Sequence, residues 1–205
     1  LTQSRDVDVD KLLLQKMTTA EPHLASLLID DVLKNPKAMV LLNGAMKDMV
    51  DTVSTQKIAR GNMKYVGVIP ENVITKLDNL DKAPQSAVIA VRDDDVLHAL
   101  RDSKQAKGIS LPVEFWEQLP EKLRHPKAIL LQAKEQQRNK NAGDALLFVY
   151  EPEKGKVAVK MDYEVKIKDE LSGKKLAHKL NIVRTASVVE DFTQLGAFEV
   201  LYGSL

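Results

Sequence analysis

The segment from Val96 to Lys104 combines an imidazole with a permanent cation. On a helix, His98 and Arg101 are three residues apart and share one side, while the neighbouring apolar residues turn toward a core. An imidazole beside a guanidinium can do acid–base chemistry on a phosphate. The same pattern also fits a helix whose polar side meets water, with His98 hydrogen-bonded to Asp94 or Asp102. Both interpretations are open at the level of the sequence.

Several kinds of active site are excluded by what the sequence lacks. Cysteine is absent, which excludes disulfides, thiolate metal sites and a cysteine nucleophile. The four histidines are far apart and lack the spacing of metal ligands. There is no phosphate-binding loop, no dinucleotide-binding glycine pattern, no His-Glu-x-x-His and no Gly-x-Ser-x-Gly. The sequence therefore predicts either metal-free chemistry by His, Arg, Lys, Ser and Thr, without a cofactor, or no chemistry.

The composition is that of a soluble globular protein, with 205 residues of which 44% are hydrophobic and 29% charged. No apolar run approaches the length of a membrane-spanning helix, so we expect no membrane partner. A chain that begins with Leu1 indicates a domain taken from a longer protein. Residues 121–184 hold 15 lysines and arginines against 9 aspartates and glutamates, although the whole chain has a net charge of +1. This basic region suits an anionic partner such as RNA, and lysines on a solvated strand face would explain it equally well.

The N-terminal part has the periodicity of helices. The pattern predicts a short helix over residues 11–18, a second over Pro22–Leu33, and a third that opens with an Asn-Pro pair at 35–36. The third carries an apolar stripe from Met39 to Val53, which either joins a core or binds a partner helix. We interpret residues 1–60 as a helical connector whose stripe is covered by the second helix or by another chain. A fragment without it is expected to fold.

The remainder reads as mixed helix and strand. Short strands are predicted at 65–69 and 87–91. Helices are predicted at 70–77, from Asp93 to near Gly108, and from Pro112 to Gln118, where Pro120 stops the helix. A β-meander follows, with strands at Ala128–Gln132, Ala145–Tyr150, 157–167 and 176–189, and then a tail closed by a short helix.

Alternation from Val157 to Ile167 is the strongest secondary-structure signal, and it places all six odd-numbered residues on one buried face. The sequence therefore predicts an α+β protein, in which a helical N-terminal segment precedes helices packed on an antiparallel β-meander.

This order of elements, with five short motifs, resembles the C-terminal region of the F proteins of Mu-like phages and prophages, which are minor head or head-morphogenesis proteins. The resemblance covers about residues 64–205. The motifs are His-Ala-Leu-Arg-Asp-Ser-Lys at 98–104, Pro-Val-Glu-Phe-Trp-Glu-Gln-Leu-Pro at 112–120, Pro-Lys-Ala-Ile-Leu-Leu at 126–131, Leu-Leu-Phe-Val-Tyr at 146–150 and Val-Arg-Thr-Ala at 183–186.

The resemblance implies two functions. One is a structural or interaction module of the virion in head morphogenesis, with other phage head proteins as partners. The alternative is a toxin or effector domain with the fold shared by barnase, EndoU, RelE and colicin-type RNases, carried by residues 61–205. That fold implies metal-independent cleavage of RNA by attack of the 2′-hydroxyl on its own phosphate. Either function places the protein in the bacterial cytoplasm or in the virion.

A site of this kind needs a base, an acid and a cation for the phosphorane oxygens. The resemblance implies His98 as acid or base, Arg101 as phosphate clamp and Thr185 as a group that positions the phosphate. Lys104, Lys160, Arg184 and Ser187 are expected to help bind the substrate. Strand alternation places Arg184 and Thr185 on opposite faces, so a site that contains both requires a bulge.

Overall fold

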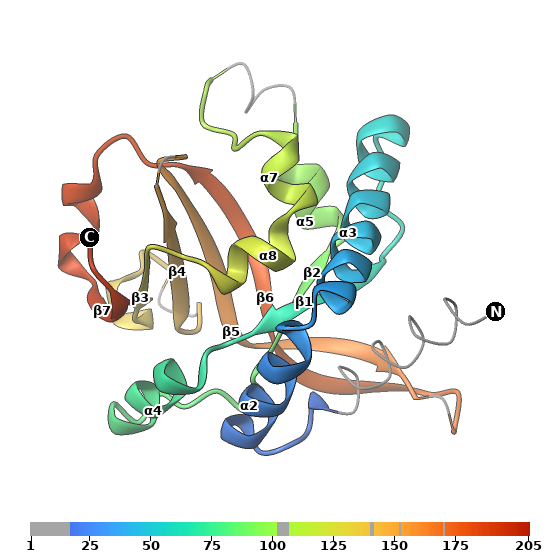
Figure 1. Ribbon diagram of the computed structural model, residues 1–205, viewed down its shortest axis with the longest axis horizontal. Helices are drawn as coiled ribbons and strands as arrows, with labels where there is room; N and C mark the ends of the chain where they lie inside the picture. The colour runs from blue at the N-terminus through green and yellow to red at the C-terminus, as the bar shows by residue number, and fades with distance from the viewer. Residues whose placement is uncertain (1–16, 102–106, 140–141, 152, 170) are drawn as a thin grey trace.

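The computed structural model describes residues 17–101, 107–139, 142–151, 153–169 and 171–205 (Figure 1). Within them the fold is α+β, with seven strands in one mixed sheet of order β1-β2-β6-β5-β4-β3-β7. Most of the helix predicted at 11–18 lies outside the described residues. None of the helices in the described segments is long and apolar enough to cross a lipid bilayer.

The N-terminal helices form where their capping residues predict them. Helix α2 spans Pro22–Leu33, and the Glu21 carboxylate accepts hydrogen bonds from two backbone N–H groups of its first turn. Helix α3 spans Pro36–Gln56, with Asn35 as its N-cap and Lys57 in the left-handed conformation at its C-cap. Both boundaries therefore follow from local chemistry.

The middle of the chain alternates short strands and helices. They are β1 (Met63–Val68), α4 (Glu71–Asn79), β2 (Val88–Arg92), α5 (Asp93–Ala99), α7 (Val113–Glu117) and α8 (Leu119–Arg124).

One predicted helix end is wrong, and α7 ends at Glu117, next to the predicted Gln118, for a different reason than the one expected. α5 was expected to continue to near Gly108, but it ends at Ala99, where the Ser110 hydroxyl donates to the Ala99 carbonyl. Pro120 does not stop a helix but lies in the first turn of α8, where its missing N–H is tolerated.

The C-terminal part is a meander with one added strand. It contains β3 (Ala128–Gln132), the 3₁₀ turn η1 (Lys134–Gln136), β4 (Ala145–Tyr150), β5 (Gly155–Lys168), β6 (Lys175–Val188), the 3₁₀ segment η2 (Phe192–Ala197) and β7 (Glu199–Gly203). The tail was expected to end in a helix, yet β7 pairs antiparallel with β3. The sheet is not wholly antiparallel either, because β2 pairs parallel with β6.

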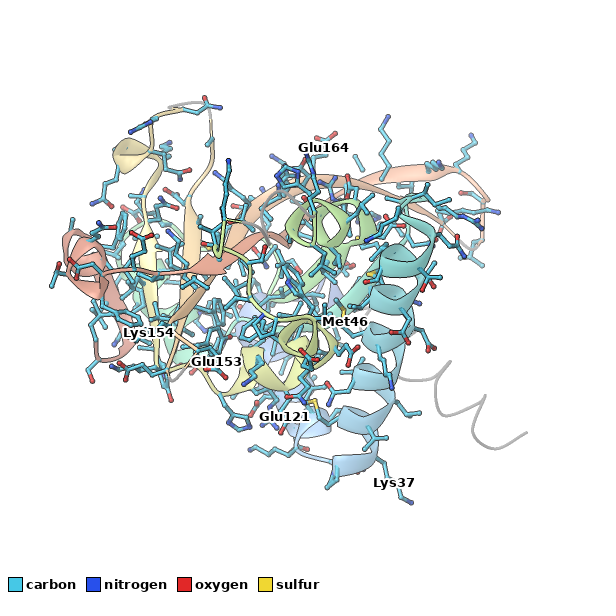
Figure 2. All side chains as sticks on the ribbon, turned by 90° about the horizontal axis from the view of Figure 1, so that it is seen from above. Lys37, Met46, Glu121, Glu153, Lys154 and Glu164 are labelled. Atoms are coloured by element: carbon cyan, nitrogen blue, oxygen red, sulfur yellow. The ribbon has the colours of Figure 1, made fainter. Side chains whose placement is uncertain are left out.

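The main core lies on the side of the sheet covered by helices, which we call the helix face. Met46, Met49, Val50 and Val53 of α3 are buried there, and α3 packs on α5, α7 and α8. Figure 2 shows Met46 directed from α3 toward the body of the molecule. The apolar stripe of α3 is therefore core, and it is covered mainly by helices that follow it in the chain.

The opposite side, the far face, carries two smaller apolar clusters. One joins Ile29 and Leu33 of α2 to Val88 and Ala90 of β2 and to neighbouring residues of β6. The other lies on β3 and β4 and packs with Leu195 of η2. Between the two clusters the far face is polar.

A bulge in β5 overturns part of the predicted alternation. Val157, Val159 and Met161 are buried in the main core, as predicted. The pairing with β6 then shifts between Lys160 and Tyr163, and Asp162 has a φ of 53°. The extra residue reverses the faces, so Tyr163 and the odd-numbered residues after it pack in the far-face cluster that contains α2.

Candidate functional site: a cationic cluster on the far face

A second bulge decides which side chains of β6 share a face. The pairing of β6 with β5 skips Arg184, because Thr185 is opposite Ala158 while Val183 is opposite Val159. Val183 and Ala186 both lie in the main core. The two residues between them, Arg184 and Thr185, therefore lie on the far face together, whereas simple alternation predicted opposite faces.

Two arginines meet over one tyrosine ring on this face. The guanidinium carbons of Arg92 and Arg184 lie 4.9 Å and 5.0 Å from the centre of the Tyr163 ring. A terminal nitrogen of Arg184 also donates to the Tyr163 hydroxyl at 3.1 Å. The parallel pairing of β2 with β6 produces this meeting, because Val91 is opposite Val183 and the next residue of each strand is an arginine.

Asp95, in the first turn of α5, is the counter-ion of both arginines. Its carboxylate accepts from Arg92 Nε at 3.1 Å, and its other oxygen lies 3.7 Å from Arg184. Only 10% of its side chain is exposed. Burial raises the pKa of Asp95 above its ordinary value, and the attraction of Arg184 and Arg92 opposes that rise. The carboxylate thus holds both guanidinium groups in place.

Lys160 is the third cation of the cluster. It precedes the β5 bulge and lies on the far face, whereas its neighbours on the strand, Val159 and Met161, lie in the main core. Its ammonium group donates to the Gln137 side-chain oxygen at 2.6 Å. Burial lowers the pKa of Lys160, and the positive charge of Arg184 lowers it further. A lysine whose pKa is lowered is better able to accept and return a proton. We call Arg92, Lys160, Tyr163 and Arg184 the cationic cluster.

Thr185 and Ser187 lie beside the cluster on the far face. Ser187 is opposite Lys156, one residue before the buried Val157, and Thr185 is exposed. No side-chain hydrogen bond of Thr185 occurs within the described residues. Its hydroxyl is thus available to a ligand. The structure brings Lys160, Arg184, Thr185 and Ser187 to one face.

The expected pair of His98 and Arg101 does not form a joint helical site. Because α5 ends at Ala99, Arg101 follows the helix and lines a groove with Lys57 and Leu97, between α3 and α7. His98 is exposed in the last turn of α5. It lies three residues after Asp95, on the same side of the helix that contacts Arg184. Lys104 lies outside the described residues.

The sequence analysis missed Arg92, Asp95 and Tyr163. Arg92 lies between the predicted strand at 87–91 and the predicted helix that begins at Asp93, and Asp95 lies in that helix. The predicted alternation places Tyr163 on the buried face of its strand. The sequence signals their contact only in that an arginine follows an apolar strand segment twice. These are Arg92 after residues 88–91 and Arg184 after residues 182–183. Among the described residues, no three His, Asp or Glu side chains gather as a metal site.

Comparisons with known proteins add no relative. No family model matches this chain, and neither a curated protein nor a solved structure matches it. The kinship with Mu-like F proteins stays a prediction.

Proposed function

We propose that this protein binds RNA at the cationic cluster and cleaves it without a metal ion. The observation that carries the proposal is the β6 bulge, which places Arg184 and Thr185 on one face with Lys160 and Arg92. A guanidinium has five N–H donors, and the contacts described use only a small part of them. The remaining donors suit the non-bridging oxygens of a phosphate.

In this reaction Lys160, in its neutral form, accepts the proton of the RNA 2′-hydroxyl. The 2′-oxygen bonds to the adjacent phosphorus, and the bond from phosphorus to the 5′-oxygen breaks. His98, as imidazolium, donates a proton to the departing 5′-oxygen. The products are a 2′,3′-cyclic phosphate and a 5′-hydroxyl end. Arg92 and Arg184 stabilise the charge of the phosphorane, and Thr185 positions the phosphate.

The test is cleavage of an end-labelled RNA in the presence of a chelator. Lys160→Met should lower the rate by about 10²–10⁴-fold, because a general base is lost. Arg184→Met should lower it by about 10²–10³-fold, because one donor to the transition state is lost. Lys47→Met, an exposed lysine of α3, is the matched control and should leave the rate unchanged. At acidic pH, where His98 stays protonated, the rate of the wild type should rise with pH as neutral Lys160 becomes more abundant, and Lys160→Met should remove that rise.

A second function, that of a head-assembly module without turnover, is favoured by a different surface. Leu24, Leu27 and Leu28 of α2 lie on one side of the helix and are 54%, 57% and 46% exposed. RNA that stays intact with the wild-type protein would overturn the nuclease proposal and leave assembly as the function to test. Loss of co-sedimentation with phage head proteins on Leu27→Ser would then support it.

A further inference from the structure

The β5–β6 hairpin extends beyond the rest of the sheet as a two-stranded arm. Figure 1 shows its outer half projecting past β1 and β2. Glu164, labelled in Figure 2, lies near the point where the arm leaves the body. From there the strands pair in register from Tyr163 opposite Leu180 to Lys168 opposite Lys175.

The two faces of the arm differ sharply in chemistry. One face carries Val165 and Ile167 and continues the far-face cluster of α2. The other face carries Glu164 and four lysines, all of them exposed. These lysines are Lys166, Lys168, Lys175 and Lys179. We call this surface the lysine face.

The lysine face has one carboxylate, Glu164, opposite Lys179, against its four lysines. None of its four lysines has a side-chain hydrogen bond or ion pair within the described residues. Lys168 and Lys175 are direct cross-strand neighbours, an arrangement that destabilises a sheet because like charges repel. Lys166 and Lys168 alternate along β5, about 6.7 Å apart, while Lys175 and Lys179 on β6 are four residues apart. The four ammonium groups therefore form a positively charged surface that is complementary to the phosphates of a nucleic-acid strand.

We propose that the lysine face binds the phosphate backbone of single-stranded RNA that flanks the cleaved phosphate. This inference rests on the proposed nuclease function for the identity of the ligand. The arm is built from β5 and β6, the strands that carry Lys160 and Arg184, and Lys168 lies at most about 26 Å along β5 from Lys160 at about 3.3 Å per residue. The β5 bulge places the four lysines on the opposite face of the sheet from Lys160. The RNA therefore passes around one edge of the β5–β6 hairpin between the lysine face and the cationic cluster.

The test separates binding from cleavage. Affinity is measured by fluorescence anisotropy with a 16-nucleotide RNA in which every 2′-hydroxyl is methylated, so that it cannot be cleaved. Replacing the four lysines with glutamine should reduce the slope of log affinity against log salt by about 3, since each phosphate contact on a single strand contributes about 0.7. Cleavage of a dinucleotide, which has one phosphate, should be unchanged. The matched control replaces four exposed lysines elsewhere, namely Lys37, Lys47, Lys107 and Lys154.

Each outcome has a distinct meaning. An unchanged salt slope in the arm variant would overturn the inference, while cleavage by the wild type would still support the nuclease. Equal loss in the control variant would also overturn it, because general charge would then explain binding. Arm-dependent binding to phosphatidylserine vesicles with no effect on RNA would identify a lipid surface and would overturn it too. Arm-dependent RNA binding by a wild type that cleaves neither substrate would support the arm and overturn the nuclease.

Discussion

At the scale of single residues, charge is organised by a few carboxylates. Asp95 holds two arginines on the far face, and Glu71 with Asp78 holds His23 between α2 and α4. The two groups differ in burial, because Asp95 is almost enclosed whereas the carboxylates around His23 are partly exposed. The first group can therefore set the geometry of a ligand site, while the second acts on stability.

Stability should depend on pH through His23. Its hydrogen bonds to Asp78 and then Glu71 raise the pKa of His23 above its ordinary value. The contribution is thus fully present below the unfolded pKa of about 6.5 and is lost as pH rises through the higher folded pKa. We expect His23→Gln to be less stable than the wild type at pH 5.5, by no more than about 1 kcal/mol because the groups are partly exposed. Urea denaturation at pH 5.5 and pH 9 should show this difference shrinking, and an equal difference at both values would contradict it.

At the scale of elements, two bulges determine what β5 and β6 present. The bulge at Arg184 adds an arginine to the polar part of the far face. The bulge at Met161 and Asp162 exchanges the faces of the arm, so that its lysines lie on one face and Val165 and Leu180 are buried on the other. Asp162 also accepts a hydrogen bond from the backbone N–H of Gln85 at 2.8 Å, which ties the bulge to the segment before β2.

Substitutions at Asp162 should separate its two roles, which are the positive-φ backbone conformation of the bulge and the hydrogen bond to Gln85. Asp162→Val places a β-branched side chain at a positive φ and should destabilise the fold by about 1–2 kcal/mol or more. Asp162→Gly accepts the backbone conformation and loses only the hydrogen bond to Gln85, so we expect a smaller loss. Thermal unfolding of both variants gives the order. If the valine variant were as stable as the glycine variant, the bulge would not be set by this residue.

At the scale of the whole molecule, the strongly curved sheet brings its two edges near one another. Gly67 and Val68 of β1 line the same groove as Ile129 of β3 and Tyr202 of β7. Helix α4 follows β1 and packs against β7, where Lys76 donates to the Leu201 carbonyl at 2.8 Å. The main core thus lies inside a curved sheet, with α3, α5, α7 and α8 across its open side.

A fragment of residues 61–205 should not fold cooperatively, contrary to the expectation from sequence. Its loss of α3 would remove Met46, Met49, Val50 and Val53 from the main core. At about 1.5–3 kcal/mol for each buried side chain, they contribute on the order of 6–12 kcal/mol, comparable to the whole stability of a domain. Circular dichroism of the fragment during heating is the measurement. A sharp transition with the β-sheet signal of the full chain would instead establish a domain boundary near residue 60.

The sequence by itself determined the elements whose signals are local. The Asn-Pro pair before α3 and the apolar runs of β3 and β4 predict boundaries that agree with the structure, because a cap and a short continuous apolar run between polar loops are both signals within a few residues. Only the tertiary structure decided the parallel pairing of β2 with β6, the two bulges and the added strand β7. Each of these depends on hydrogen bonds between segments far apart in the chain, which no local pattern encodes. The meeting of Arg92, Tyr163 and Arg184 follows from those pairings, and for that reason the sequence predicted some of the cluster's cations but not the cluster.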